Sequence, residues 1–239
     1  MAAAKSSEAA SQIEYLARAL KAPRISQEAL RLSEQAREAG WTHEEYLAAV
    51  LQREVSAREG SGSEIRIRAA GFPGRKSIDE FIFDHQPGLK RELITHLGTG
   101  AFLTDAGNVV LLGPPGTGKT HIAIGLGIRA AQHGHRVLFA TATEWVTRLQ
   151  HAHQLGRLPA EIARLRRYGL IIVDEVGYIP FERDAANLFF QLVSSRYEHA
   201  SMIMTSNLTF ARWGEVFGDP TTAAAMIDRI VHHAEVITL

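Results

Sequence analysis

The 239-residue chain contains no cysteine, which excludes disulfide bonds, thiolate nucleophiles and sulfur-ligated metals. It also carries no net charge, because 26 basic residues balance 26 acidic ones. Since no global positive field attracts nucleic acid, any DNA contact must come from a local patch. The sequence has neither an apolar signal-peptide core near its N-terminus nor an apolar run long enough to cross a bilayer. We therefore expect a cytoplasmic protein with no membrane partner.

The composition is otherwise that of a folded domain, with 46% hydrophobic and 22% charged residues. The length suits one α/β domain and a small appendage. Near Ile65 the hydrophobic pattern changes from helical spacing to strands that alternate with helices. We predict a helical N-terminal domain over residues 1–64, with a packing, docking or DNA-contact role left open, and an α/β core over residues 65–239.

The N-terminal domain has the start and stop signals of three short helices. Pro23 ends the first helix, Ser26 is placed to cap the second, and Gly40 is placed to end it. Thr42 and Glu45 form a capping box that starts the third helix. The residues assigned to the apolar face of the third helix are Leu47, Val50, Leu51 and Val55.

The run Gly60–Ser63 has the composition of a linker. Beyond it, five short apolar segments are separated by helical segments, which predicts a mostly parallel five-stranded sheet covered on both faces. A helix from Lys119 to about Gln132 follows the first strand. The predicted strands are residues 108–112, 136–140, 170–173, 202–205 and 235–239.

Residues 113–120 read GPPGTGKT, the phosphate-binding pattern G-x-x-x-x-G-K-T between a strand and a helix. Glycines let backbone N–H groups turn toward phosphates, and the helix N-terminus adds partial positive charge. We expect Lys119 to reach the β- and γ-phosphates and the Thr120 hydroxyl to ligate Mg²⁺. A chance match in a glycine-rich turn is the alternative. The expected nucleotide-binding residues here are Gly113, Pro114, Pro115, Gly116, Thr117, Gly118, Lys119, Thr120 and His121.

Residues 170–175 read LIIVDE, a buried strand that ends in two adjacent carboxylates. Ligands bind at the carboxyl ends of parallel strands, and neighbouring residues there point in different directions. We expect Asp174 to hold Mg²⁺ and Glu175 to polarise the attacking water. A solvated acidic turn is the alternative reading.

The strand MIMTSN ends in polar residues, of which Asn207 is predicted to orient the hydrolytic water. An amide can donate to phosphate while it accepts from water. Asn is also a common turn residue, so this signal alone is weak.

Two histidine pairs invite a metal interpretation. His232 and His233 are adjacent, and His151 and His153 are separated by one residue. Neither pair is accompanied by the acid or further histidine that a closed site requires, so we expect no transition-metal site at either.

Residues 143–168 form a helical insertion with five arginines against two glutamates. Arg148, His151 and Arg157 are candidates for a surface that contacts DNA phosphates. A solvated helix face is the alternative.

Four strings together resemble the IstB family, the helper ATPases of insertion-sequence transposition, and more distantly the helicase loaders DnaC and DnaI, all of them AAA+ proteins. The strings are GPPGTGKT, LIIVDEVGY, MIMTSN and WGEVFGDPTTAAAMIDRIVHHA. The resemblance implies an AAA+ core over residues 65–239 that binds ATP and Mg²⁺ and lacks a C-terminal helical lid. Relatives continue past the last strand with a short basic tail, and they run a continuous helix through residues 60–63, which leaves the linker open.

The resemblance also assigns roles to residues outside the phosphate loop. Arg229 corresponds to the arginine that reaches the γ-phosphate of a neighbouring subunit; an ordinary surface arginine paired with Asp228 is the alternative. The segment KSIDEF, residues 76–81, together with Phe83 is expected to flank the adenine. The insertion at residues 143–168 takes the place of a DNA-facing helix, and Arg75 and Lys76 complete the expected DNA contacts.

The function this implies is an ATP-dependent factor that forms a homo-oligomer on duplex DNA and helps a cognate transposase to select or remodel its target. Lys119, Glu175, Asn207 and Arg229 are the expected catalytic residues, and hydrolysis would drive release. A replicative helicase loader is the first alternative. A small-molecule P-loop kinase is the second, and the water-polarising Glu175 counts against it.

Overall fold

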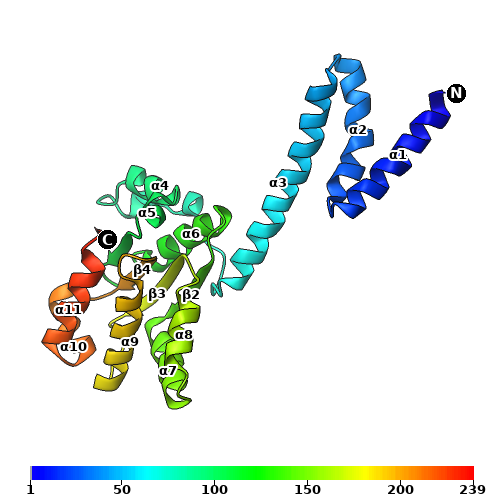
Figure 1. The fold of residues 1–239 in the computed structure, drawn as a ribbon. Coiled ribbons are helices and arrows are strands. Elements are labelled where there is room, and N and C mark those ends of the chain that lie inside the picture. Colours follow the sequence, from blue (N-terminus) through cyan, green and yellow to red (C-terminus); the bar gives the residue numbers. More distant parts are fainter. Residues whose placement is uncertain (1) are drawn as a thin grey trace. The chain divides into compact units, whose positions relative to one another are not determined.

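The computed structural model describes residues 2–239, with side chains from residue 8 onward. The chain divides into two compact units, residues 1–62 and 63–239, and the boundary falls inside one long helix (Figure 1). None of the described helices combines the length and the hydrophobicity needed to span a bilayer.

The first unit contains helices α1 (Ala2–Ala19), α2 (Pro23–Ala39) and the first part of α3 (His43–Ala69). The predicted capping box at the start of α3 is confirmed: the backbone N–H of Thr42 donates to the Glu45 carboxylate at 2.8 Å, and the N–H of Glu45 donates to Thr42 Oγ1 at 3.2 Å. Gly40 ends α2 in the left-handed conformation, as predicted.

The predicted cap at Ser26 is wrong, because α2 begins at Pro23. Proline suits a first helical turn, where its missing N–H would have no partner. The Ser26 hydroxyl instead donates back to the Pro23 carbonyl at 2.9 Å. The predicted apolar face of α3 is also mostly wrong: Val50 is buried, whereas Leu47, Leu51 and Val55 are exposed.

Of the two readings of Gly60–Ser63, the continuous helix is the correct one, since α3 passes through the run without a break. The glycines cost roughly 1 kcal/mol each relative to alanine. The end of the helix is held by packing, because Ile67 and Ala70 are buried and Arg66 Nε donates to the Ala131 carbonyl at 2.7 Å. Tertiary contacts therefore override the local composition.

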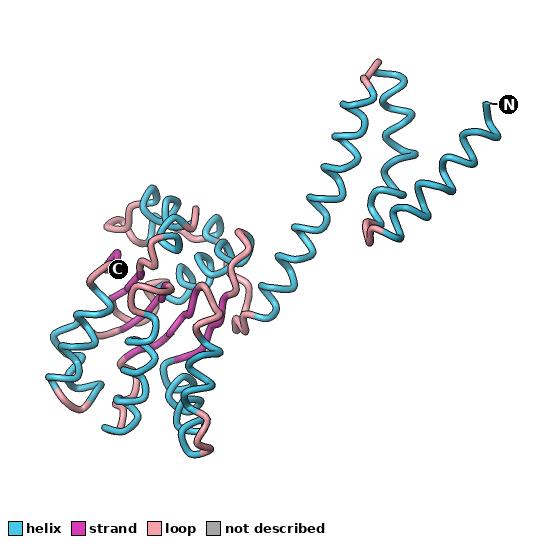
Figure 2. The backbone as a smooth tube through the Cα atoms, in the orientation of Figure 1, coloured by secondary structure: helices cyan, strands magenta, loops and turns pink. Residues whose placement is uncertain are grey.

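The second unit is built on a parallel sheet in the order β2–β3–β4–β1–β5. Figure 2 shows the strands as a layer between helices. The strands are β1 (Asn108–Leu112), β2 (Val137–Thr141), β3 (Leu170–Val176), β4 (Ser201–Ser206) and β5 (Ala234–Thr238). The helices are η1 (Ile78–Glu80), η2 (Phe83–His85), α4 (Arg91–Gly98), α5 (Ala101–Thr104), α6 (Lys119–Gln132), α7 (Ala142–Gln154), α8 (Leu158–Leu165), α9 (Arg183–Arg196), η3 (Phe210–Arg212), α10 (Trp213–Phe217) and α11 (Pro220–Val231).

The predicted α/β class and five-stranded sheet are confirmed, and β1 and α6 have the predicted bounds. Alternate residues of each strand enter two separate cores. Val109 and Leu111 pack toward α4 and α6, whereas Val110 and Leu112 pack toward α7, α9 and α11. This burial on both faces explains why the strands are nearly all apolar.

One buried arginine joins the segment before β3 to the start of β4. Arg196, at the end of α9, is 2% exposed. Its guanidinium donates to four backbone carbonyls, those of Leu165 (3.1 Å), Tyr168 (3.0 Å), Gly169 (3.4 Å) and Ser201 (2.8 Å). Burial lowers the pKa of Arg196 to about 10, so the side chain keeps its charge at neutral pH.

We predict that Arg196→Met lowers the free energy of unfolding by about 3 kcal/mol or more, because a buried carbonyl without its donor costs about 1–3 kcal/mol. Urea unfolding followed by circular dichroism measures the change. The control is Arg212→Met, which removes an exposed arginine paired with Glu215 and should change stability by less than about 0.5 kcal/mol. Equal effects of the two substitutions would contradict the anchoring role.

Candidate nucleotide-binding site

The phosphate loop lies where the parallel strands end, a border that we call the strand-ending edge. All three of its glycines have positive φ, and at two of them a side chain would also meet neighbouring atoms. Gly113 has φ +151° and lies against the backbone of Leu239, which a side chain would hit. Gly118 has φ +93°, and a β-carbon there would lie 2.5 Å from the Phe81 ring. The sequence pattern therefore corresponds to real backbone constraints.

Lys119 opens helix α6 at this edge and is only 8% exposed. Its ammonium donates to the carbonyl oxygens of Gly113 and Pro114 at 2.7 Å each. Burial lowers the pKa of Lys119, and the nearby charge of Asp174 opposes that shift. A phosphate group is a stronger acceptor for this ammonium than a neutral carbonyl.

The rest of the loop forms an exposed turn. Thr117 Oγ1 donates to the Pro114 carbonyl at 2.9 Å, while Pro115 and Gly116 face solvent. Gly116 has φ +81°, so the turn depends on its glycine.

Thr120 and Asp174, predicted as the Mg²⁺ ligands, lie side by side. Thr120 Oγ1 donates to the two carboxylate oxygens of Asp174 at 2.9 and 3.0 Å. Thr205 Oγ1 donates to Asp174 Oδ1 at 2.5 Å from the neighbouring strand. Mg²⁺ prefers such hard oxygen donors, so the residues fit this ion. Thr205 is a site residue that the sequence reasoning passed over, although it belongs to the polar end of MIMTSN.

Glu175 and Asp174 differ in exposure and in backbone conformation. Asp174 is 4% exposed, whereas Glu175 is exposed and has φ +62°. The pairing of β3 with β4 shifts between Val173 and Val176, which produces this local twist. The N–H of Glu175 donates to Thr205 Oγ1 at 2.9 Å, so one threonine fixes both acids. A left-handed glutamate costs roughly 1–3 kcal/mol, and such strain clusters at functional sites.

Asn207 follows β4 and has one buried oxygen, Oδ1, without a hydrogen-bond partner among the described residues. A β-carbon on Gly177 would lie 3.4 Å from that oxygen. The neighbouring Ser206 is fully used, since it donates to the Val176 carbonyl at 2.7 Å and accepts from the N–H of Leu208 at 3.1 Å. Asn207 therefore retains free hydrogen-bonding capacity at this edge.

The segment before α4 forms an aromatic wall beside the loop. His121 Nε2 lies 2.7 Å from the Ser77 carbonyl, and its ring meets Phe81 edge-on at 5.4 Å. Phe83 is buried between the Phe81 ring (4.9 Å) and the Arg91 guanidinium (4.3 Å). Of the predicted segment 76–81 and Phe83, it is thus the Phe81 ring that lies against Gly118.

Arg229 lies at the opposite border of the sheet, the strand-starting edge. It is on the last turn of α11, where it donates to the Ala225 carbonyl at 3.2 Å and stacks 4.6 Å over the Phe190 ring. The next residue, Ile230, accepts from the Asn108 side chain at the start of β1. The length of β1, about 13 Å, separates this edge from the subunit's own phosphate loop.

Arg148, His151 and Arg157 are brought together around one surface pocket of about 360 Å³ between α7 and α8. Arg164 also lines this pocket and was not predicted. Glu161 accepts from Arg148 at 2.6 Å and from Arg164 at 2.7 Å, which neutralises part of the charge.

Arg75 and Lys76 do not belong to that pocket. Arg75 is exposed and pairs with Glu64 at 2.5 Å, beside a separate hollow of about 410 Å³. Lys76 is exposed in the same loop.

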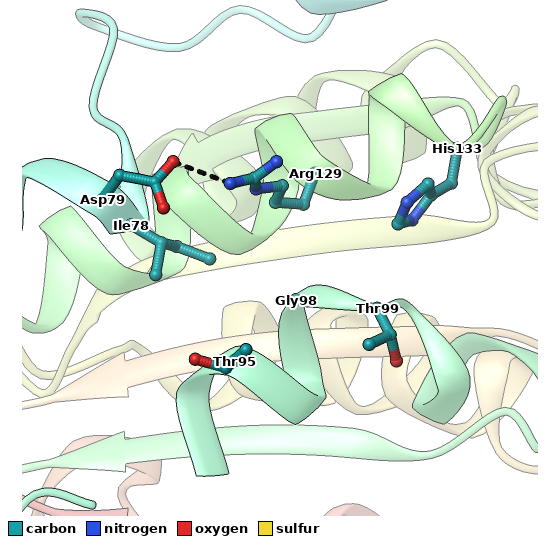
Figure 3. Close-up of a pocket in the computed structure, with 7 residues that line it drawn as sticks. All are labelled: Ile78, Asp79, Thr95, Gly98, Thr99, Arg129 and His133. Carbon is teal, nitrogen blue, oxygen red and sulfur yellow. Dashed lines mark hydrogen bonds and ion pairs between the residues drawn. The ribbon is translucent and has the colours of Figure 1, made fainter. Parts of the chain in front are cut away.

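A hollow of about 360 Å³ lies between α6 and α4, away from the residues of the phosphate loop (Figure 3). The Arg129 guanidinium reaches across to Asp79 at 2.7 Å and so ties η1 to the end of α6. The lining residues are Ile78, Asp79, Thr95, Gly98, Thr99, Arg129 and His133.

The sequence of this chain is similar to those of known ATP-binding proteins of insertion sequences. The insertion sequence IS21 ATP-binding protein of Pseudomonas aeruginosa is 41% identical over 95% of this chain and 86% of the relative. The insertion sequence IS5376 ATP-binding protein of Geobacillus stearothermophilus is 37% identical over 83% of this chain and 79% of the relative.

Among solved structures, the DnaC helicase loader superposes with a TM-score of 0.58 at 18% identity, covering 68% of this chain and 96% of that chain. This likeness confirms the fold predicted for the α/β core. The family described as IstB-like ATP binding protein matches residues 15–239. The chain therefore belongs to the IstB-like ATP-binding proteins.

Proposed function

We propose that this protein hydrolyses ATP and that ATP controls its assembly on duplex DNA, where it helps a transposase to select or remodel target DNA. The observation that carries the proposal is the arrangement around Thr205. That hydroxyl holds the buried Asp174 beside Thr120 and also fixes the exposed Glu175. Hydrolysis of ATP needs one carboxylate that holds a metal ion and another that polarises the attacking water, and Asp174 and Glu175 suit these two roles.

In this proposal, Lys119 exchanges its two carbonyl acceptors for the β- and γ-phosphates of ATP. Thr120 and Asp174 would hold Mg²⁺, which neutralises charge on the phosphates when bound. Glu175 accepts a proton from the attacking water, and Asn207, whose Oδ1 has no hydrogen-bond partner among the described residues, orients that water.

The position of Arg229 supports a role in a neighbouring subunit. Its own phosphate loop lies at the other edge of the sheet, so the guanidinium can serve only a nucleotide that another copy presents. An arginine delivered in this way stabilises charge in the transition state. ATP bound between copies would then hold a homo-oligomer together.

The arginines around the α7–α8 pocket are the proposed DNA contact. Three arginines and one glutamate leave it positive, and phosphate contacts need no base-specific geometry. Arg75 and Lys76 are a second, separate basic site in the same proposal.

Two alternative functions remain distinguishable by experiment. A helicase loader shares the fold, but the close relatives are proteins of insertion sequences, which favours the transposition role. A small-molecule kinase has no use for a water-activating glutamate, so the exposed, strained Glu175 counts against it.

We predict that Lys119→Ala abolishes ATP binding, because it removes the charge that meets the β- and γ-phosphates. Calorimetric titration with ATP measures this loss. Electron microscopy with ATP and duplex DNA should show assemblies of the unsubstituted protein and none of the variant. The control Lys90→Ala, at an exposed residue, should keep both properties. Wild-type ATP affinity in Lys119→Ala would refute the loop assignment.

For the α7–α8 pocket, Arg148→Ala with Arg157→Ala should weaken binding about equally on all duplex sequences. The slope of log affinity against log salt should flatten by about 2, since each lost phosphate contact contributes about 0.9. Fluorescence anisotropy over a salt series measures both quantities. The control Arg148→Lys with Arg157→Lys preserves both charges and should keep most of the salt dependence. An unchanged slope in the alanine variant would make these arginines an ordinary solvated face.

Glu175→Gln should retain ATP binding, lose about 10²–10⁴-fold in hydrolysis, and leave DNA complexes that persist. Arg229→Ala should lose roughly 10³–10⁵-fold in hydrolysis, and its assemblies should be weaker because ATP no longer bridges subunits. The control Arg212→Ala, an exposed arginine that pairs only with Glu215 among the residues described, should hydrolyse ATP normally.

Mixing the two inactive variants tests the role between subunits. An interface that pairs Glu175 of one copy with Arg229 of the next should recover part of the phosphate release. If the variants co-assemble and the mixture stays inactive, Arg229 does not act in a neighbouring subunit.

A further inference from the structure

The sequence analysis assigned no acidic partner to the adjacent histidines His232 and His233, but the fold supplies one from a separate element. Glu198, just after α9, lies next to them, and one possible ligand atom from each of the three residues falls within 4.8 Å of the others. Among the described residues, no other group of three or more His, Asp or Glu side chains comes together in this way. The expectation that the pair lacks an acid is therefore wrong, because a separate element provides it.

The cluster lies at the C-terminal ends of two packed helices. His232 is the C-terminal cap of α11, and Tyr197, immediately before Glu198, is the cap of α9. Helix C-termini carry partial negative charge and favour a cation, independently of the side chains. This placement is a second feature that suits a bound metal ion.

The backbone presents Glu198 in a fixed position. Its φ of +56° is unusual for a residue other than glycine. The following N–H groups, of His199 and Ala200, both donate to the carbonyl of Arg196, at 2.9 and 3.0 Å. Because the Arg196 side chain is anchored in the core, the turn that carries Glu198 is anchored as well.

A tyrosine orients one of the histidines. Tyr197 Oη lies 3.1 Å from His232 Nδ1, and the ring of His233 meets that of His232 at 4.3 Å. Burial and the charge of Glu198 raise the pKa of Tyr197. A partner at Nδ1 leaves Nε2 as the nitrogen for a metal, as is usual for metal-binding histidines.

We propose that Glu198, His232 and His233 form a binding site for a divalent first-row transition metal, with Zn²⁺ as the natural occupant. Two imidazoles and one carboxylate are a known zinc ligand set that leaves the fourth position to water. Nitrogen ligands disfavour Ca²⁺ and Mg²⁺, which prefer oxygen. Tetrahedral zinc needs ligand atoms about 3.4 Å apart. The three ligand atoms lie within 4.8 Å of one another, and their side chains are exposed, so small side-chain rotations bring them to that distance.

The metal would link the ends of α9 and α11, one turn from Arg229. The site needs neither ATP nor DNA, so its existence does not depend on the proposed function. It would fix the helix end that presents Arg229 at the strand-starting edge.

The test uses the untagged full-length protein and Zn²⁺ alone, in competition with a chromogenic chelator. We expect one Zn²⁺ per chain, and at least tenfold weaker binding in each of His232→Ala, His233→Ala and Glu198→Gln. The controls His153→Ala and Glu235→Gln remove an exposed histidine and an exposed acid outside the cluster and should bind as before. Excess Mg²⁺ or Ca²⁺ should not compete.

Two further measurements separate ligation from folding. Co²⁺ in place of Zn²⁺ should give the visible absorption of a four-coordinate ion, and the triple variant should lose it while its circular dichroism is unchanged. Tyr197→Phe should weaken zinc binding about tenfold, as expected for loss of a hydrogen bond to a ligand. Zinc binding that is unchanged in the triple variant, or no binding by the unsubstituted protein, would overturn the proposal.

Discussion

The hydrogen bonds to the Asp174 carboxylate are the interaction on which the rest of the candidate site depends. They join β3 to α6 through Thr120 and to β4 through Thr205, at the edge where the strands end. Bonds to a charged acceptor are worth about 1.5–3 kcal/mol each. Because the carboxylate is almost fully buried, losing one of these donors would leave its charge less well compensated. The same threonine accepts from the N–H of Glu175, so the two adjacent carboxylates share one support.

The two edges of the parallel sheet have different chemistry. The strand-ending edge gathers the phosphate loop, both carboxylates and Asn207, as expected wherever parallel strands finish together. The strand-starting edge gathers Arg229 and the cluster of Glu198, His232 and His233. In the proposed function, the first edge binds the subunit's own nucleotide and the second faces the nucleotide of a neighbouring copy. Arg196 supports the second edge from inside, through its bonds to the start of β4 and the segment before β3.

Local patterns predicted the elements whose signals are local. The bounds of β1 and α6 followed from an apolar run and the phosphate motif, and the capping box at Thr42 followed from two residues. The errors have tertiary causes. Gly60–Ser63 continues a helix because its far end is packed, and the apolar face of α3 is mostly exposed because neighbouring helices cover only Val50. The segment 76–81 and Phe83 were predicted beside the nucleotide, but only the packing decides that the Phe81 ring approaches Gly118.

By itself, the sequence determined the α/β class, the phosphate loop and the acidic strand end, because each depends on residues adjacent in the chain. The spacing of apolar side chains along a strand or helix and the positions of glycines in a turn depend on residues close together in the chain, so the sequence shows them directly. Only the tertiary structure decided that Thr205 joins the two acids, that Arg229 lies at the edge opposite its own phosphate loop, and that Glu198 lies beside the histidine pair. Those relations join residues that are distant in the chain, and strand order, register and helix packing set them rather than any local preference.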